Sequence, residues 1–188
     1  MPSVSRSIPL FYPNKRYIVC DISHFVSFYD IILDISHKRG GNMVCTFFGH
    51  KDAQPQIIDI LKAEIYKLIE NNVRLFLVGN NGNYDFMVQN LLCEVCTTIP
   101  YINHKIILSR IDERAISGNQ DKTFFPEGFE KFPPRFAISK RNEWLIKNSN
   151  FAIVYAKYKY SNSYKLLMKS IKNGLMVTNI ADNQKQTP

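Results

Sequence analysis

The sequence predicts an α/β fold in three layers, a Rossmann-like arrangement in which a mainly parallel sheet of about five strands lies between two layers of helices. Two observations from Met43 onward carry this prediction: short, continuously apolar runs alternate with longer amphipathic stretches, and the two kinds of segment follow one another regularly. Strands of a parallel sheet are covered on both faces, so they are apolar throughout. The length of 188 residues suits one domain of ordinary size.

The first predicted unit is an apolar strand, a loop and a helix with an apolar stripe. The stripe consists of isoleucines and leucines spaced three and four residues apart, from Ile57 to Ile69, which is typical of a helix that packs on a sheet. The same order of strand, loop and helix then repeats. In chain order, the segments predicted up to residue 96 are strand Val44–Phe48, loop Gly49–Pro55, helix Gln56–Asn71, strand Leu75–Val78, loop Gly79–Tyr84 and helix Asp85–Cys96.

The second half of the chain continues the alternation after one long interruption. Gly174 stops the last helix, because glycine is favoured just beyond a helix C-terminus. In chain order, the segments predicted here are strand Lys105–Leu108, a long loop from Arg110 to about Pro134, helix Arg135–Asn148, strand Phe151–Tyr155, helix Ser163–Asn173 and strand Leu175–Asn179.

Residues 1–42 lack this pattern and contain three prolines, Pro2, Pro9 and Pro13. We interpret this segment as an N-terminal extension, either an accessory element or a stretch translated from a misassigned start. In the alternative interpretation, Tyr17–Cys20 adds an edge strand and Phe25–Ile35 a helix. The Rossmann-like domain is predicted to span residues 43–181, and residues 182–188 to form a flexible tail.

Composition limits the function classes. Hydrophobic residues make up 45% and charged residues 21%, which excludes disordered and fibrous proteins and disulfide-stapled miniproteins. The net charge of +8 favours anionic partners. No apolar run long enough for a membrane span and no signal peptide is recognisable, so we expect a cytoplasmic protein with no membrane partner. Four cysteines, Cys20, Cys45, Cys93 and Cys96, lie in apolar or helical settings that suit reduced thiols.

Two loops at predicted strand ends contain residues suited to phosphate. In a parallel sheet, ligands bind beyond the carboxyl ends of the strands, where helix N-termini present free N–H groups. The first loop places Gly49 before His50 and Lys51, an imidazole and an ammonium; a tight turn with two solvated side chains is the alternative. The second, Gly79–Asp85, contains two glycines and three asparagines, which allow a ligand to approach the main chain closely. Asp85 also fits a simpler role as a helix cap.

Two later segments add cations and aromatic rings. Arg135 begins a helix after a proline pair, and Arg141 with Asn142 could bind phosphate or ribose; the alternative is a solvated basic helix with Trp144 in the core. The segment Tyr155–Lys165 interleaves tyrosines with lysines, which suits base stacking and phosphate neutralisation. The alternative there is an exposed loop in which Ser163 caps a helix.

Metal and redox chemistry have little support in the sequence. Cys93 and Cys96 share a helix face, but no second cysteine pair or histidine pair completes a tetrahedral site, so we interpret them as core residues. His104 has no identifiable partner. No Walker loop, zinc-protease motif or nucleophile elbow is present, and we predict no metal and no cofactor.

In order and spacing, the motifs resemble the SLOG superfamily, in particular its small stand-alone bacterial members of unknown function. The motifs are C-x-F-x-G-H-[RK] at Cys45–Lys51, G-x-x-G-x-[FY]-D at Gly79–Asp85, and R-N-x-W at Arg141–Trp144, within a resemblance that covers Met43–Ala181. The superfamily is a Rossmann-like relative of the Lonely Guy phosphoribohydrolases and of the DNA-processing protein A fold. It implies binding of nucleotides or nucleotide-derived ligands, in some members with cleavage of an N-glycosidic bond.

The resemblance also implies site residues. Carried over to this chain, they line three strand ends, and together with the loop residues above they give one candidate ligand-binding set: Gly49, His50, Lys51, Gly79, Asn80, Gly82, Asp85, Arg135, Arg141, Asn142, Ser161 and Ser163. Two departures matter. Tyr160–Ser163 replaces the glycine pair with which relatives cradle a phosphate, and the P-G-G-x-G-T-x-x-E loop of the Lonely Guy enzymes is missing.

Three functions follow as hypotheses. The leading one is a sensor or accessory module that binds a nucleotide or nucleotide-derived small molecule without strong catalysis. The first alternative is an N-glycosidic hydrolase acting on a nucleoside or nucleotide, with Asp85 or Glu143 as acid or base. The second alternative is a protein that binds single-stranded nucleic acid through Tyr155–Lys165. The resemblance also makes a homodimer plausible.

Overall fold

A sheet of six parallel strands organises the part of the chain that the structure describes. The computed structural model describes residues 43–111 and 120–183, which belong to a unit beginning at Asn42, so the predictions for residues 1–42 and for the tail beyond Asn183 lie outside the described residues. The strands lie in the order β4-β3-β2-β1-β5-β6, and every neighbouring pair is parallel. Their bounds are β1 Met43–Gly49, β2 Val73–Val78, β3 Asn103–Ile107, β4 Thr123–Phe124, β5 Phe151–Tyr155 and β6 Met176–Asn179.

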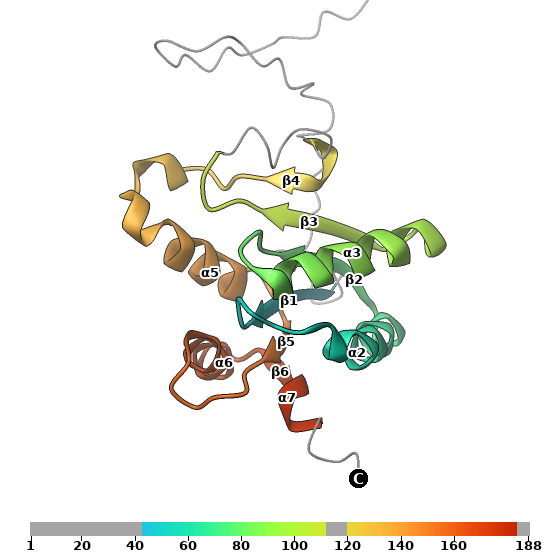
Figure 1. The fold of residues 1–188 in the computed structure, drawn as a ribbon. Coiled ribbons are helices and arrows are strands. Elements are labelled where there is room, and N and C mark those ends of the chain that lie inside the picture. The colour runs from blue at the N-terminus through green and yellow to red at the C-terminus, as the bar shows by residue number, and fades with distance from the viewer. Residues whose placement is uncertain (1–42, 112–119, 184–188) are drawn as a thin grey trace, which may run out of the picture. The chain divides into compact units, whose positions relative to one another are not determined.

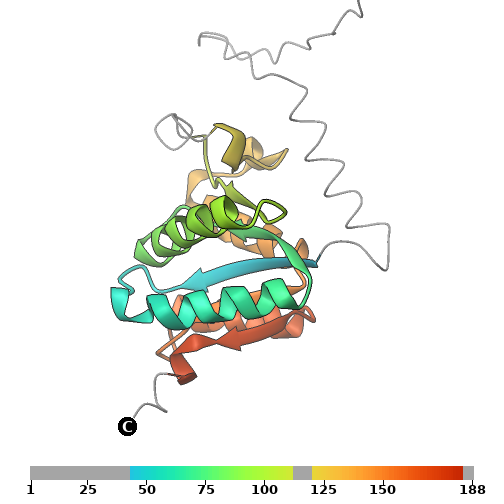
Figure 2. The same ribbon diagram turned by 90° about the vertical axis from the view of Figure 1, so that its right-hand side faces the viewer.

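Helices cover both faces of this sheet, as the apolar strands predicted (Figures 1 and 2). Helices α2 and α3 lie over one face, and α5 and α6 over the other. The α-helices are α2 Ile58–Glu70, α3 Asn83–Thr98, α5 Ala137–Lys147, α6 Asn162–Lys172 and α7 Ile180–Asn183, and the short 3₁₀ turns are η1 Pro55–Ile57, η2 Gln120–Lys122, η3 Phe129–Lys131 and η4 Pro134–Phe136. The three-layer Rossmann-like fold is therefore confirmed. No helix in the described ranges is long and apolar enough to cross a membrane.

Two of the predicted helices begin with a 3₁₀ turn. The expected starts at Gln56 and Arg135 fall inside η1 and η4, and regular α-helix follows from Ile58 and Ala137. Both turns open on a proline. Proline lacks an N–H and has a fixed φ, so the first residue of a helix is where it costs least.

The alternative interpretations of Asp85 and Ser163 as the caps of the other two long helices are wrong. Helix α6 begins one residue earlier than expected, and Ser161 is its cap: the Ser161 hydroxyl accepts a hydrogen bond from the Tyr164 N–H at 3.1 Å, while Ser163 is buried inside the helix. Helix α3 follows Gly82, and Asp85 lies in its first turn without capping it. Both errors arise because several polar residues near each start could satisfy the free N–H groups.

Strand β4 lies inside the predicted long loop. It consists of Thr123 and Phe124, which pair with Ile106 and Ile107 of β3. Two residues are too few to form an apolar pattern, so this sixth strand could not be predicted from the sequence.

The core is densest between the sheet and the helices α2 and α3. Phe47 and Phe76 pack against each other with ring centroids 6.0 Å apart, and Ile65 of α2 and Leu92 of α3 close over them. Cys45 is a buried, free thiol of this core, and Cys93 and Cys96 are free and half-buried.

On the other face of β1, the hydroxyl of Thr46 is fully buried and has no hydrogen-bond partner among the described residues. Replacing Thr46 with valine keeps the shape of the side chain and removes the unpaired hydroxyl, so we expect the free energy of unfolding to rise by about 1 kcal/mol. Urea unfolding measures this change. Thr98→Val is the control, because the exposed Thr98 hydroxyl already donates to the Glu94 carbonyl at 3.1 Å. If the T46V protein is less stable than the wild type, the Thr46 hydroxyl does not destabilise the fold, and the prediction is wrong.

Candidate functional site

The carboxyl ends of β1 and β5 form a topological switch point. The chain builds β1 to β4 toward one side of the sheet and then returns to place β5 on the other side of β1. The helices that follow β1 and β5, α2 and α6, consequently cover opposite faces (Figure 1). In open parallel sheets, ligands bind in the crevice outside such a point. We call the region beyond these strand ends the carboxyl edge.

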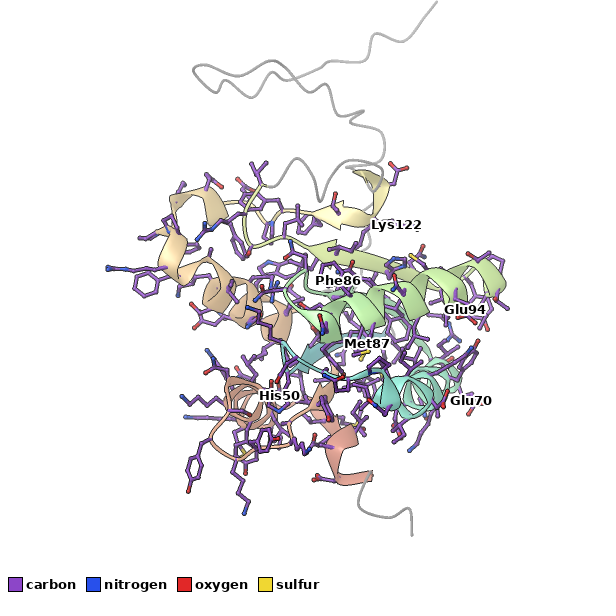
Figure 3. The ribbon with its side chains drawn as sticks, viewed as in Figure 1. His50, Glu70, Phe86, Met87, Glu94 and Lys122 are labelled. Carbon is purple, nitrogen blue, oxygen red and sulfur yellow. The ribbon has the colours of Figure 1, made fainter. Side chains whose placement is uncertain are left out.

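His50 joins the segments that leave β1 and β5 at this edge (Figure 3). The Lys157 N–H donates a hydrogen bond to His50 Nε2 at 3.0 Å, and the ring lies edge-on to Tyr155 and 5.5 Å from the ring of Tyr158. Burial lowers the pKa of His50, with Lys157 acting in the same direction and Asp52 opposing. The acceptor role of Nε2 requires the neutral imidazole that this lowered pKa favours.

The first two predicted loops lie side by side. The Asn83 N–H donates to the Lys51 carbonyl at 2.9 Å. Gly82 has a φ of 101°, and a Cβ there would lie only 2.8 Å from the Lys51 Cα, so both its conformation and its surroundings require glycine. The Lys51 side chain itself is exposed. The loops are therefore in backbone contact, and the ammonium of Lys51 remains available at the carboxyl edge.

Gly49 has a packing role. The fully buried ring of Tyr84 lies against it, and a Cβ at Gly49 would come within 2.1 Å of Tyr84 Cγ. The Tyr84 hydroxyl donates to the Ile153 carbonyl at 3.2 Å, and its ring stacks near that of Tyr155. The space beside Gly49 is thus filled by a side chain of the protein.

A buried ion pair fixes the second loop to helix α5. Asp85 Oδ2 accepts a hydrogen bond from the Asn81 N–H at 2.8 Å and lies 3.9 Å from Arg141 Nη2. Arg141 Nη1 donates to Asn80 Oδ1 at 3.1 Å, and its Nε and Nη2 both donate to Asn142 Oδ1, at 3.2 and 3.0 Å. Four predicted site residues, Asn80, Asp85, Arg141 and Asn142, are therefore brought together.

Burial dominates the electrostatics of this pair. Asp85 is 6% exposed and Arg141 4%. Desolvation raises the pKa of Asp85, with the charge of Arg141 and the Asn81 hydrogen bond opposing it. It also lowers the pKa of Arg141, with Asp85 opposing. The two groups bind each other and the neighbouring amides, so this cluster acts first as a structural clamp on residues 79–85.

Gly79 lies under the same clamp. A Cβ at Gly79 would approach Asp85 Oδ2 to 2.4 Å and the Arg141 guanidinium carbon to 2.8 Å. The two glycines of the second loop therefore have different functions: Gly79 makes room for the ion pair, and Gly82 for the first loop.

The remaining predicted site residues are dispersed. Arg135 is exposed on η4, with its guanidinium 4.8 Å from the Phe136 ring centre. Glu143 of α5 pairs with Lys169 of α6 at 2.9 Å and with Lys140 of its own helix at 3.0 Å, and these hydrogen bonds lower its pKa. An ionised, doubly paired carboxylate is poorly suited to the role of general acid at neutral pH.

Between β5 and α6, side chains point into solvent rather than into the protein. We call Lys157, Tyr158, Lys159 and Tyr160 of this connection, together with Lys165 in the first turn of α6, the tyrosine–lysine segment; all five are exposed, Tyr158 by 61% and Tyr160 by 95%. The Lys157 ammonium lies 5.6 Å from the centre of the Tyr158 ring. Sequence reasoning identified this composition but not the contact of Tyr158 with His50, because the two residues lie in different loops.

Comparison with known proteins supplies fold relatives. No family model and no curated protein matches the chain. Among solved structures, DNA processing protein A (DprA) from Streptococcus pneumoniae superposes with a TM-score of 0.55 and 14% identity over 79% of this chain and 50% of that one, so the chain spans about half the length of that protein. A structure that describes the single-stranded DNA binding mode of DprA from Helicobacter pylori matches with a TM-score of 0.50 and 12% identity, over 84% of this chain and 74% of that one.

At these identities the likeness concerns the fold. It agrees with the parallel sheet, the switch point and the two helical layers described above. The chain thus has a DprA-like Rossmann fold, the fold that its SLOG-like motifs predicted.

Proposed function

We propose that this protein binds single-stranded nucleic acid through the tyrosine–lysine segment at its carboxyl edge. The observation that carries the proposal is the exposure of two tyrosine rings among three lysines, in the segment that follows β5 at the switch point. Bases of any sequence stack on aromatic rings, and lysines neutralise the phosphates between them.

Further support comes from the surroundings and from the fold relatives. Lys51, the neighbouring exposed cation of the first loop, extends the positive charge along the same edge. The H. pylori protein that shares this fold is described as having a single-stranded DNA binding mode. Asp85 and Arg141, in contrast, are occupied with each other, which makes the exposed segment the better candidate for direct ligand contact.

The second candidate is a nucleotide or nucleotide-derived small molecule at the switch point. It is favoured by the convergence of Lys51, His50 and the Lys157 backbone at the ends of β1 and β5. An N-glycosidic hydrolase has less support, since Glu143 is held between two lysines and Asp85 is paired with Arg141.

Fluorescence anisotropy with a labelled oligothymidylate tests the first candidate. Tyr160→Ala removes an almost fully exposed ring, so it leaves the fold intact and is expected to weaken binding by about tenfold, equivalent to about 1.4 kcal/mol. Lys159→Gln should weaken binding and lower the slope of log affinity against log salt by about 0.7, the value for one phosphate contact on a single strand.

Matched controls lie elsewhere on the surface. Tyr101 is 59% exposed but precedes β3, at the opposite edge of the sheet, so Tyr101→Ala should bind the oligonucleotide like the wild type. Lys172→Gln, at the end of α6, is the matched control for Lys159→Gln and should leave the affinity and its salt dependence unchanged. The proposal would be contradicted if Y160A and Y101A lost affinity for the oligonucleotide equally. It would also be contradicted if the wild-type protein did not bind the oligonucleotide at low salt. Calorimetric titration with mononucleotides in parallel tests the second candidate separately.

A further inference from the structure

A second group of chemically competent side chains lies away from the carboxyl edge. Cys93 and Cys96 are in the C-terminal half of α3, His104 is the second residue of β3, and Lys122 directly precedes β4. Figure 3 shows Lys122 and, on α3, Glu94 apart from His50. We call Cys93, Cys96, His104 and Lys122 the dithiol cluster.

The contacts within the dithiol cluster are specific. Cys96 Sγ lies 3.2 Å from His104 Nδ1, and Cys93 Sγ lies 3.8 Å from His104 Nε2. Lys122 Nζ donates to Cys93 Sγ at 3.5 Å. Because each sulfur faces a different nitrogen of the ring, the three donors do not converge on one point, and the described residues contain no group of three or more such side chains arranged to hold a metal ion.

The charges give the two sulfurs different chemistry. Burial, Lys122 and Lys105 lower the pKa of His104 to about 4, so at neutral pH the ring has one N–H and one acceptor nitrogen. Burial and the nearby Cys93 raise the pKa of Cys96, with Lys122 opposing, so this sulfur retains its proton. The arrangement that satisfies all partners has the Cys96 S–H donating to Nδ1 and the Nε2–H donating to Cys93.

Cys93 is therefore the sulfur beside positive charge. The ammonium of Lys122 donates to Cys93 Sγ, and His104 Nε2 lies on another side of the same sulfur, so a cation and a ring nitrogen both contact it. The adjacent Glu94 opposes this, but its carboxylate is paired with Lys62 at 2.9 Å. Cys93 is half-buried, so a small oxidant can reach it.

We propose that Cys93 and Cys96 form a redox-responsive dithiol, in which a hydroperoxide oxidises Cys93 and Cys96 converts the product to a disulfide. The Cys93 thiolate attacks one peroxide oxygen, the O–O bond breaks, and sulfenic acid forms while the alkoxide or hydroxide leaves and takes up a proton. Cys96 then transfers its proton to His104 Nδ1, its sulfur attacks Cys93 Sγ, and the S–O bond breaks. The leaving hydroxide takes the proton from His104, so the products are the disulfide, an alcohol or water from the peroxide, and one water.

The helix makes this disulfide strained and reversible. Residues three apart on an α-helix have Cβ atoms about 5 to 6 Å apart, whereas a disulfide needs about 3.5 to 4.5 Å. Cys96 is only two residues from the end of α3 at Thr98, so the last turn can tighten to close the gap. Strained disulfides are reduced readily, which suits a response that thiols reverse.

Peptide mapping of the full chain tests the proposal without any mutation. Trypsin releases residues 75–105 as one peptide, and Cys93 and Cys96 are its only cysteines. After treatment with hydrogen peroxide, we expect this peptide to lose two hydrogen atoms, to resist alkylation, and to regain both thiols with dithiothreitol. Two alkylatable thiols after peroxide treatment, or a cross-link from Cys93 to any other cysteine, would overturn the proposal.

Variants assign the roles within the pair. The Cys96→Ser variant should stop the reaction at a sulfenic acid on Cys93, which dimedone traps. In the Cys93→Ser variant, dimedone should find no sulfenic acid on Cys96. Lys122→Gln should slow alkylation of Cys93 by iodoacetamide by about fivefold, because the cation beside the sulfur is gone. Lys67→Gln, on the exposed side of α2, is the control for charge. Equal rates in the two lysine variants would show that Lys122 does not activate Cys93 and would overturn the assigned roles.

Discussion

Replacing Arg141 with methionine is expected to lower the free energy of unfolding by about 3 to 5 kcal/mol at neutral pH, because it leaves Asp85 buried without a counter-charge. Methionine fills much of the same volume, so the loss reports charge rather than a cavity. Asn80 and Asn142 also lose the donor that they share. Urea unfolding of wild type and R141M measures the difference.

The effect of R141M should depend on pH in a defined direction. Burial already raises the pKa of Asp85 in the folded protein, and Arg141 is the group that opposes this, so the variant raises it further. The folded state then binds a proton more tightly than the unfolded chain, and the cost of the substitution shrinks as pH falls through the raised pKa toward about 4. D85N/R141M, which removes both charges, should recover most of the stability. If R141M lowers the free energy of unfolding by the same amount at about pH 5 and pH 7, the ion-pair assignment is wrong.

Gly49→Ala is expected to have the second-largest effect, a loss of about 3 kcal/mol. The new methyl group would overlap the Tyr84 ring, with 2.1 Å between Cβ and Cγ. The ring cannot turn away, since it is fully buried, lies beside Tyr155 and donates to the Ile153 carbonyl. Urea unfolding again gives the measurement.

Two further variants separate overlap from backbone strain. Gly174 has a φ of 83° and open space around it, so Gly174→Ala should cost only about 1 kcal/mol, through its conformation alone. In the G49A background, Tyr84→Leu should be less damaging than in the wild type, because it relieves the overlap. Additive losses in that double variant would show that Gly49 and Tyr84 are not coupled.

The layers of the fold could be predicted because they depend on repeated, local signals. The strand Phe151–Tyr155 matches β5 in the structure, and the long helices differ from their predicted ranges only near their ends. Strand β4 could not be found, since its two residues pair with β3 only after the chain has folded. Caps are similarly hard to predict: Ser161 and Ser163 are both suitable by chemistry, and only the backbone decides between them.

The candidate site could be predicted as a set of loops but not as a set of contacts. The burial of Arg141 could be predicted from its spacing. It lies four residues after Ala137 and four before Leu145, which places all three on the buried face of α5. A cation at such a position indicates a buried acidic partner, and only the fold identifies it as Asp85. For the dithiol cluster, the sequence indicated only that Cys93 and Cys96 share a helix face. It gave no partner for His104, because β3 and η2 supply the rest of the cluster.

The switch point has a consequence for how the protein folds. His50 and Lys157, which meet there, are 107 positions apart in the chain. Contacts between such distant residues form slowly, because a long loop must close before any stabilising interaction is gained. During synthesis, β1 through β4 leave the ribosome before β5 has been made. Until then, the edge of β1 that pairs with β5 has no hydrogen-bonded neighbour. The pairing that creates the switch point is thus also one that leaves an unpaired strand edge of the nascent chain exposed to aggregation until β5 has been made.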